Sequence, residues 1–160
     1  MTWLCTINRD GSDFYVFSNV TYASHYNWRD NGNLVIWASV NGTPGMYLLA
    51  DQNREAERLA PDFFDRNLHC VYSPDRQYIL GDSYPDSGDF VNGYRRIYLF
   101  NTKTGEGSML IRLKSDPAAT ADIRCDLHNR WSPDGRTISL DSTHEGYRGL
   151  YVADVDGVRR

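Results

Sequence analysis

Apolar and β-branched residues alternate with polar ones in short stretches along most of the chain. Residues 137–142 form one such stretch, which follows a turn made by Pro133, Asp134 and Gly135. Pro presets the φ angle of such a turn, and Gly adopts a positive φ without a Cβ clash. Strict alternation is typical of a half-buried strand, because successive side chains point to opposite faces. The pattern therefore predicts an all-β chain of short strands joined by tight turns.

The combination of strand, turn and strand occurs three times. In each copy an aromatic residue precedes the turn, a histidine stands three residues before the aromatic residue, and a serine stands eleven residues after it. The aromatic residues are Trp28, Tyr72 and Trp131, the histidines are His25, His69 and His128, and the serines are Ser39, Ser83 and Ser142. Each copy continues into a third apolar stretch, at 46–49, 97–100 and 150–153. A period of roughly 40–50 residues made of short strands is typical of propeller blades.

We therefore predict a partial β-propeller of about three blades, each a four-stranded antiparallel sheet. Residues 1–18 would form half a blade, 24–60 and 68–113 one blade each, and 125–160 an incomplete blade. The first strands are expected at about 24–28, 68–72 and 126–131, with a long loop at 84–94 in the second blade. Known propellers close with typically 4–8 blades. We therefore expect further blades or self-association to complete the ring, and we expect the isolated fragment to be inactive.

Composition removes several classes of function. The net charge of −4 over 160 residues argues against a nucleic-acid partner. No apolar run approaches the roughly 18 residues of a membrane helix, so no membrane partner is expected. The N-terminal residues lack the basic region and apolar core of a signal peptide. Three cysteines, Cys5, Cys70 and Cys125, are an odd number and lie far apart. This favours free thiols in a reducing compartment, and hence a cytoplasmic location.

The three repeated histidines are the strongest candidates for chemistry. The first strand of a propeller blade lines the central channel, so His25, His69 and His128 should converge near the axis. Asp126 precedes His128 by two residues and would share a face of the first strand. Imidazole and carboxylate together suit a divalent metal such as Mn²⁺ or Zn²⁺. The alternative is structural, with each histidine hydrogen-bonded to its own turn, as in WD-type propellers.

The loops that should open on the same mouth supply further candidates. Asp82 and Asp141 are equivalent in the repeat, which favours a structural role as caps of their own backbone. Arg95, Arg96 and Arg124 could pair with a carboxylate, and for Arg95 and Arg96 the alternative is simple solvation at the surface. His144 and Glu145 have no counterpart in the second blade, so they are better candidates for a site-specific role than Asp82 and Asp141, although a solvated loop is the stronger alternative. The predicted substrate-binding residues are Tyr84, Arg124, His144 and Glu145.

Five segments carry motifs of a known family. They are Ser24-His25-Tyr26-x-Trp28, His69-Cys70-x-Tyr72-Ser73-Pro74-Asp75, Asp126-Leu127-His128-x-x-Trp131-Ser132-Pro133-Asp134-Gly135, Asp141-Ser142-x-His144-Glu145-Gly146 and Leu150-Tyr151-x-x-Asp154. These segments resemble the later blades of oligogalacturonate lyase-like proteins over nearly the whole chain. The resemblance implies the last three blades of a seven-bladed propeller with a metal, usually manganese, in its channel. It also implies cleavage of short oligogalacturonides by β-elimination in the cytoplasm.

The resemblance assigns roles by position. His25 resembles the catalytic base of the family, and His69 and His128 resemble metal ligands. The family has a histidine at the position of Asp126 and a glutamine at that of Ile123. We predict that Asp126 completes the ligand set as a carboxylate. The catalytic arginine of the family lies upstream of the first residue of this sequence.

The implied reaction is metal-assisted. The ion would bind the uronate carboxylate and stabilise the charge that develops as the C5 proton leaves, while a neutral His25 takes that proton. The alternative is a non-catalytic Tol-like or WD-like propeller with structural histidines. Its channel mouth, rich in Tyr and Trp, would bind a glycan or a protein. The expected partner is therefore an oligouronide or another carbohydrate, with Mn²⁺ as the expected cofactor.

Overall fold

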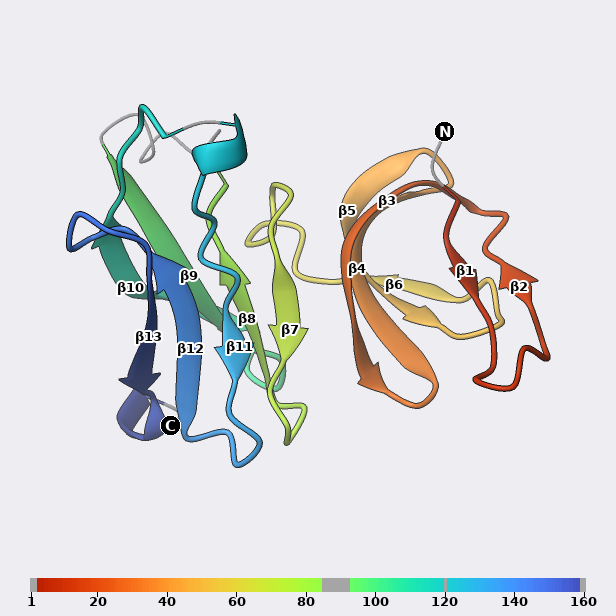
Figure 1. Ribbon diagram of the computed structural model, residues 1–160. Helices are drawn as coiled ribbons and strands as arrows, with labels where there is room; N and C mark the ends of the chain where they lie inside the picture. Colours follow the sequence, from red (N-terminus) through yellow and green to blue (C-terminus); the bar gives the residue numbers. More distant parts are fainter. Residues whose placement is uncertain (1–2, 85–92, 120, 159–160) are drawn as a thin grey trace. The chain divides into compact units, whose positions relative to one another are not determined.

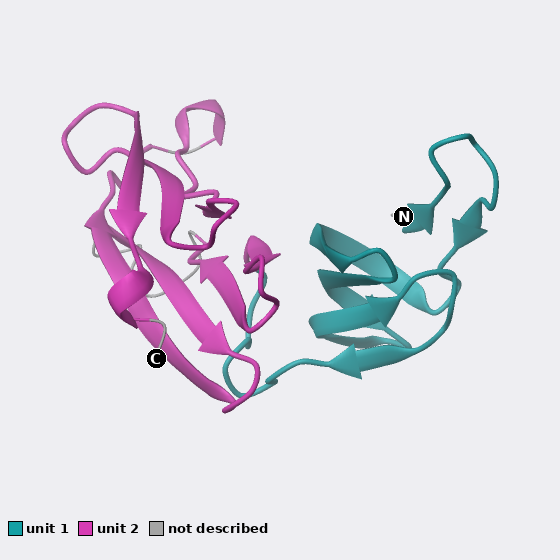
Figure 2. Cartoon of the chain, turned by 90° about the horizontal axis from the view of Figure 1, so that it is seen from below, with its two compact units in different colours: residues 1–67 teal, residues 68–160 magenta. Residues whose placement is uncertain are grey.

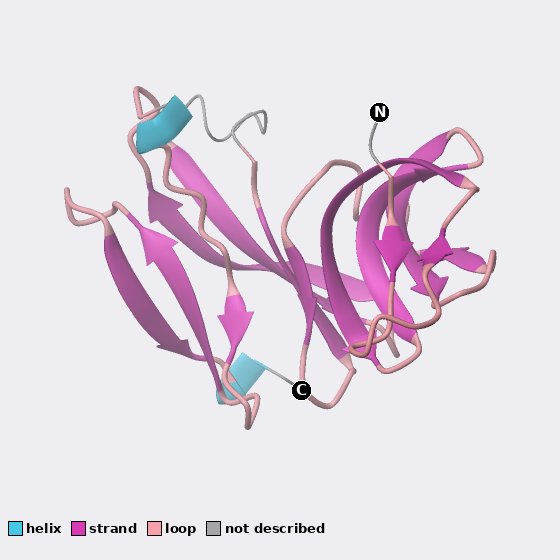
Figure 3. Cartoon of the chain, turned by 45° about the vertical axis from the view of Figure 1, so that its right-hand side comes forward, coloured by secondary structure: helices cyan, strands magenta, loops and turns pink. Residues whose placement is uncertain are grey.

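The computed structural model describes residues 3–84, 93–119 and 121–158. Strands dominate these residues, and the helical turns among them are two short 3₁₀ segments, η1 (Ala121–Ile123) and η2 (Asp156–Val158) (Figure 3). The prediction of an all-β chain is confirmed. Within the described residues, no helix has the length and apolar character needed to cross a membrane. The chain divides into two compact units, residues 1–67 and 68–160, which are described separately (Figure 2).

Unit 1 contains a short hairpin and a four-stranded antiparallel meander (Figure 1). The hairpin consists of β1 (Cys5–Thr6) and β2 (Tyr15–Val16), and the meander of β3 (Val20–Asp30), β4 (Asn33–Val40), β5 (Thr43–Ala50) and β6 (Ala56–Arg58). Leu4 and Phe17 beside the hairpin pack into one core with Leu34, Ile36 and Leu49 of the meander. Burial of these apolar side chains is the main force that holds the unit together.

The first strand of this meander is longer than predicted. It was expected at 24–28, but β3 pairs with β4 from Val20 to Asp30. The ladder skips from Ser24 to Tyr26, so His25 is the extra residue of a β-bulge and has a φ of +47°. A bulge lets a strand bend and continue, and alternation alone does not reveal this.

Unit 2 contains two antiparallel sheets. The first has the order β10-β9-β8-β7 and the second β11-β12-β13. Their strands are β7 (Cys70–Tyr72), β8 (Tyr78–Asp82), β9 (Tyr94–Asn101), β10 (Glu106–Lys114), β11 (Arg130–Trp131), β12 (Thr137–Ser142) and β13 (Gly149–Asp154). The sheets share one core, in which Leu80 and Ile97 of the first meet Leu127, Ile138 and Leu140 of the second. This core fixes the two sheets of unit 2 against each other.

The predicted turns between first and second strands are present in both sheets of unit 2. Ser132 donates to Asp134 at 2.6 Å, and the backbone N–H of Arg136 donates to the same carboxylate at 3.1 Å. Gly135 has a φ of +71°, as its place in the turn requires. In the other sheet the equivalent residue is Arg76, which adopts a φ of +61°. The middle copy therefore keeps the turn geometry with a less suitable residue.

Two details of the predicted strands are wrong. First strands were expected at 68–72 and 126–131, but β7 begins at Cys70 and β11 at Arg130. His69 and His128 therefore lie just before these strands rather than within them. His128 has a φ of +43°, so it and Asp126 do not share a face of one regular strand. The long loop predicted at 84–94 lies mostly outside the described residues.

Candidate metal centre

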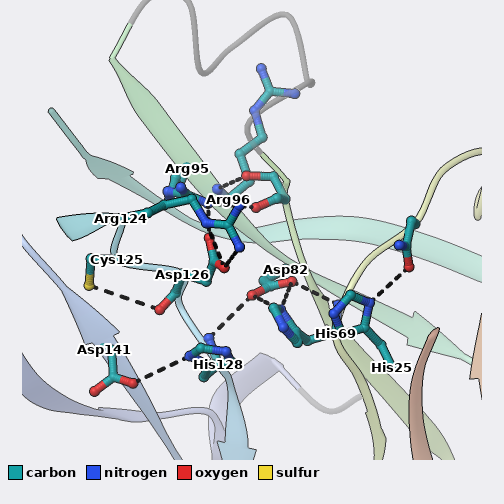
Figure 4. Close-up of polar contacts among 12 residues, drawn as sticks. His25, His69, Asp82, Arg95, Arg96, Arg124, Cys125, Asp126, His128 and Asp141 are labelled. Carbon is teal, nitrogen blue, oxygen red and sulfur yellow. Dashed lines mark hydrogen bonds and ion pairs between the residues drawn. The ribbon is translucent and has the colours of Figure 1, made fainter. Parts of the chain in front are cut away.

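Three side chains of unit 2 meet close to the starts of β7 and β11, the first strands of its two sheets. His69, Asp126 and His128 each bring one possible ligand atom within 4.8 Å of the others (Figure 4). The rings of His69 and His128 lie 4.3 Å apart between centroids. His69 precedes β7 and the other two precede β11, so both sheets contribute. Two imidazoles and a carboxylate form a nitrogen and oxygen donor set that suits a divalent transition metal.

Asp82 orients the ring of His69. This aspartate ends β8, and its side chain has no exposed surface. Its carboxylate lies 2.9 and 3.1 Å from Nδ1 of His69 and also accepts the backbone N–H of His69 at 3.0 Å. When a neutral imidazole donates Nδ1–H to a carboxylate, its lone pair is on Nε2. His69 would therefore offer Nε2 to an ion.

His128 is held through its backbone and its surroundings. Its N–H donates to Oδ2 of Asp82 at 3.2 Å, and its Nδ1 lies 3.7 Å from Oδ2 of Asp141. Burial, followed by the charge of neighbouring His69, lowers the pKa of His128 below its ordinary value. Nearby carboxylates oppose this shift without reversing it. The ring is therefore neutral at pH 7, as a metal ligand must be.

Asp126 is a buried carboxylate between two guanidinium groups. Its Oδ1 lies 2.9 Å from Nη1 of Arg95, and its Oδ2 lies 2.7 and 3.0 Å from Nη2 and Nε of Arg124. Arg95 is only 1% exposed, so the interpretation that it is solvated is wrong. A carboxylate has about four lone-pair sites, so these contacts leave Asp126 able to bind an ion as well. The donor set fits a divalent metal.

Two of the predicted substrate-binding residues border this cluster. The guanidinium carbon of Arg124 lies 5.2 Å from the centroid of the Tyr84 ring, which lies 5.6 Å from that of His69. Burial, followed by the charge of Asp126, raises the pKa of Tyr84, so its hydroxyl stays protonated at neutral pH. Both side chains are half-buried. A cation and an aromatic face thus adjoin the candidate ligands.

The other two predicted substrate-binding residues have their described contacts elsewhere in unit 2. Nδ1 of His144 lies 2.9 Å from Oγ of Ser142. Glu145 accepts hydrogen bonds from the hydroxyls of Tyr147 and Tyr151 at 2.7 and 3.0 Å. His144 also lines a pocket of about 570 Å³ with Gly93, Tyr94, Lys114, Ser115, Asp116, Pro117, Thr143 and Gly146. Their role in substrate binding stays a prediction.

His25 belongs to unit 1, and its role as a base also stays a prediction. Its Nδ1 lies 2.8 Å from Oγ of Ser24 and 2.9 Å from Oδ1 of Asn67. It shares its repeat position, and a positive φ, with His128. A non-glycine residue seldom adopts this conformation.

The sequence contained a signal for the role of Asp82 that was interpreted otherwise. An aspartate directly precedes the repeated serine in both sheets of unit 2, as Asp82 and Asp141, whereas unit 1 has Ala38 there. Nδ1 of His69 and Nδ1 of His128 each have one of these carboxylates beside them, while Nδ1 of His25 has an amide and a hydroxyl. The aspartate is present in the two copies whose histidine has a carboxylate beside Nδ1, and it is absent from the copy whose histidine does not. This pattern indicates that the aspartate orients the histidine ring rather than caps a turn. The role of Arg95 had no comparable signal.

The repeated antiparallel meanders define the chain as part of a β-propeller. No protein-family model and no curated protein matches it. An oligogalacturonate lyase solved in complex with manganese superposes with a TM-score of 0.70 and 21% identity, over 95% of this chain and 40% of that one. TolB from Acinetobacter baumannii superposes with a TM-score of 0.61 and 18% identity, over 94% of this chain and 35% of that one. The chain thus spans less than half of either structure, and these similarities establish the fold.

Proposed function

We propose that His69, His128 and Asp126 bind a divalent metal, with Mn²⁺ as the first candidate. We further propose that the chain is part of an oligogalacturonate lyase-like propeller that acts on oligogalacturonides or related uronates by β-elimination. The observation that carries the proposal is the convergence of two imidazoles and one carboxylate within 4.8 Å, from two sheets. Similarity of fold to a lyase solved with manganese supports the choice of metal and of substrate class.

Each residue of the cluster has a distinct part in this proposal. His69 would use Nε2, because Asp82 occupies Nδ1. His128 would bind as a neutral imidazole, and Asp126 would contribute negative charge. When bound, the ion would supply the positive charge that a uronate needs as its C5 proton leaves.

The residues next to the cluster would bind the sugar. Arg124 can pair with a uronate carboxylate through its planar guanidinium, and the Tyr84 ring offers an apolar face to a sugar ring. The net charge of −4 does not attract a polyanion over long distances, so attraction must be local. His25 is proposed as the base that takes the C5 proton, on the resemblance of its motif. An oligouronide or other carbohydrate partner and a cytoplasmic location are proposals on the same footing.

The second candidate is a non-catalytic propeller that binds a glycan or a protein. Two observations favour it. Asp126 is already neutralised by two guanidinium groups, and the TolB propeller has a similar fold. In this case Arg95, Arg124 and Asp126 form a structural ion-pair network, and the histidines orient the backbone.

Metal uptake followed by product analysis separates the two candidates. Calorimetric titration with Mn²⁺ should give near-stoichiometric binding to the wild-type chain and none to the double variant His69→Ala/His128→Ala. His144→Ala is the matched control and should bind as wild type does, because its ring lies against Ser142 and Tyr151. Unchanged uptake in the double variant would exclude the proposed site.

The loaded chain is then incubated with oligogalacturonides, and unsaturated uronate is followed by absorbance. Metal-dependent product that is lost in the double variant supports the lyase. Saturable binding of the oligosaccharide that is the same with and without Mn²⁺ supports the non-catalytic candidate, whereas absence of product alone does not, because the isolated chain is expected to be inactive.

A further inference from the structure

We propose that Asp82 is the positioning residue of the metal centre, fixing both the ring of His69 and the backbone of His128. The inference rests on the proposed metal site and assigns a role to a residue that does not itself touch the ion. Its basis is that one carboxylate accepts N–H groups from both histidines, which precede first strands of different sheets.

Both carboxylate oxygens of Asp82 contact the two histidines. Oδ1 accepts the backbone N–H of His69 at 3.0 Å, and Oδ2 lies 2.9 Å from its Nδ1. Oδ2 also accepts the backbone N–H of His128 at 3.2 Å. The hydrogen bond between His128 and Asp82 joins residues 46 apart in the chain. A shift of Asp82 would therefore move both candidate ligands.

Burial explains why the carboxylate holds this position. The Asp82 side chain has no exposed surface, and a buried charge is costly unless hydrogen bonds satisfy it. The N–H donors supplied by His69 and His128 meet that need, so the carboxylate has a strong preference for the observed orientation. The ring of His69 is then fixed with Nδ1–H toward Asp82 and the lone pair of Nε2 pointing away from it.

The chain contains an internal comparison for this role. Asp141 has the same repeat position, but its Oδ2 lies 3.7 Å from Nδ1 of His128 and 3.9 Å from Nη2 of Arg148. Its side chain is 19% exposed, against none for Asp82. A longer contact that water can reach constrains the ring less. Asp82 should therefore matter more to the metal than Asp141 does.

The first test reads the tautomer of His69 directly and needs no metal. Nitrogen-15 NMR of the metal-free wild-type chain at pH 8 should show His69 protonated on Nδ1 and unprotonated on Nε2. In Asp82→Asn this preference should be lost or reversed, whereas Asp141→Asn should leave it intact. A wild-type His69 protonated on Nε2 would overturn the proposal, even if the Asp82 variant failed to fold.

The second test measures Mn²⁺ affinity of the same variants, with circular dichroism as the check on folding. Asp82→Asn should weaken binding by about 10–100-fold, the usual effect of losing a partner behind a ligand, and Asp141→Asn by less. Folded Asp82→Asn with wild-type affinity would overturn the proposal. If the wild-type chain binds no Mn²⁺, the proposed metal function fails, while the tautomer measurement still decides whether Asp82 orients His69.

Discussion

The three cysteines differ sharply in burial, which the sequence alone does not show. All are free thiols; Cys5 is exposed, whereas Cys70 and Cys125 are buried. Burial, followed by the charge of Asp82, raises the pKa of Cys70 to about 12, and burial also raises the pKa of Cys125. Only the thiolate is nucleophilic, so both buried thiols are unreactive at neutral pH.

We therefore expect one fast-reacting thiol in the native chain. A colorimetric disulfide reagent at pH 8 should modify one thiol quickly and two only after denaturation. Cys5→Ser should remove the fast phase. Two or more fast thiols in the wild type would show that the environment of Cys70 or Cys125 is more open than described.

The buried ion pair between Arg95 and Asp126 gives a second prediction. Their side chains are 1% and 6% exposed. Arg95→Met leaves the carboxylate with Arg124 as its remaining charged partner, and breaking a buried pair costs about 3 kcal/mol of unfolding free energy. Urea denaturation measures this loss. Arg136→Met is the control, because that arginine is 69% exposed and its effect should stay below about 0.5 kcal/mol.

At the residue scale, the sequence grouped His69, Asp126 and His128 but did not show what holds them, and the expected convergence of His25 with them stays a prediction. Equivalent positions of a repeat are visible in the sequence, so His69 and His128 could be grouped. Asp126 could be added because it lies two residues before His128. Contacts between residues 13 and 46 positions apart are not visible in the sequence. The contacts of Asp82 with His69 and His128 are of this kind. Arg95 was ambiguous for the same reason, because burial of a cation depends on its partner in space.

At the scale of elements, strand existence was predictable and strand bounds were not. The alternation and turn residues located the meanders, because both are local features. The starts of β7 and β11 were misplaced because residues before them direct N–H groups to Asp82 instead of to a ladder. The bulge at His25 likewise depends on pairing with β4.

The turn between β7 and β8 offers a test of this local description. Arg76 adopts a φ of +61° where the equivalent turn of the next sheet has Gly135. The left-handed conformation costs a residue with a Cβ about 1–2 kcal/mol, so Arg76→Gly should stabilise the fold by about 1 kcal/mol after loss of chain entropy is counted. Thermal unfolding measures the change. Gly135→Arg should destabilise by a similar amount, and a destabilising Arg76→Gly or a stabilising Gly135→Arg would contradict the assigned turns.

At the scale of the whole molecule, the sheet of β11, β12 and β13 presents an open edge. Among the described strands, β13 pairs with β12 alone, and its Leu150 and Val152 are 67% and 69% exposed. An exposed apolar edge strand readily pairs with another strand. The sequence predicted an incomplete blade at 125–160 because it showed no convincing fourth strand there, but it did not show which side chains this edge exposes.

We expect the chain to self-associate through this edge. Sedimentation velocity should show the oligomeric fraction rising with concentration, and Val152→Lys should reduce it, because a charge on an edge strand opposes pairing. Thr104→Lys, in an exposed turn, is the control and should leave it unchanged. A chain that stays monomeric at all concentrations would contradict the prediction.

In the proposed function, two sheets of unit 2 build one metal site. The anomalous scattering of manganese in crystals of the chain grown with Mn²⁺ locates the ion directly. We expect one strong peak at coordination distance from His69, His128 and Asp126, with Nε2 of His69 facing the ion and Nδ1 facing Asp82. Manganese bound only elsewhere, or no peak with the Asp126 carboxylate still held between Arg95 and Arg124, would contradict it.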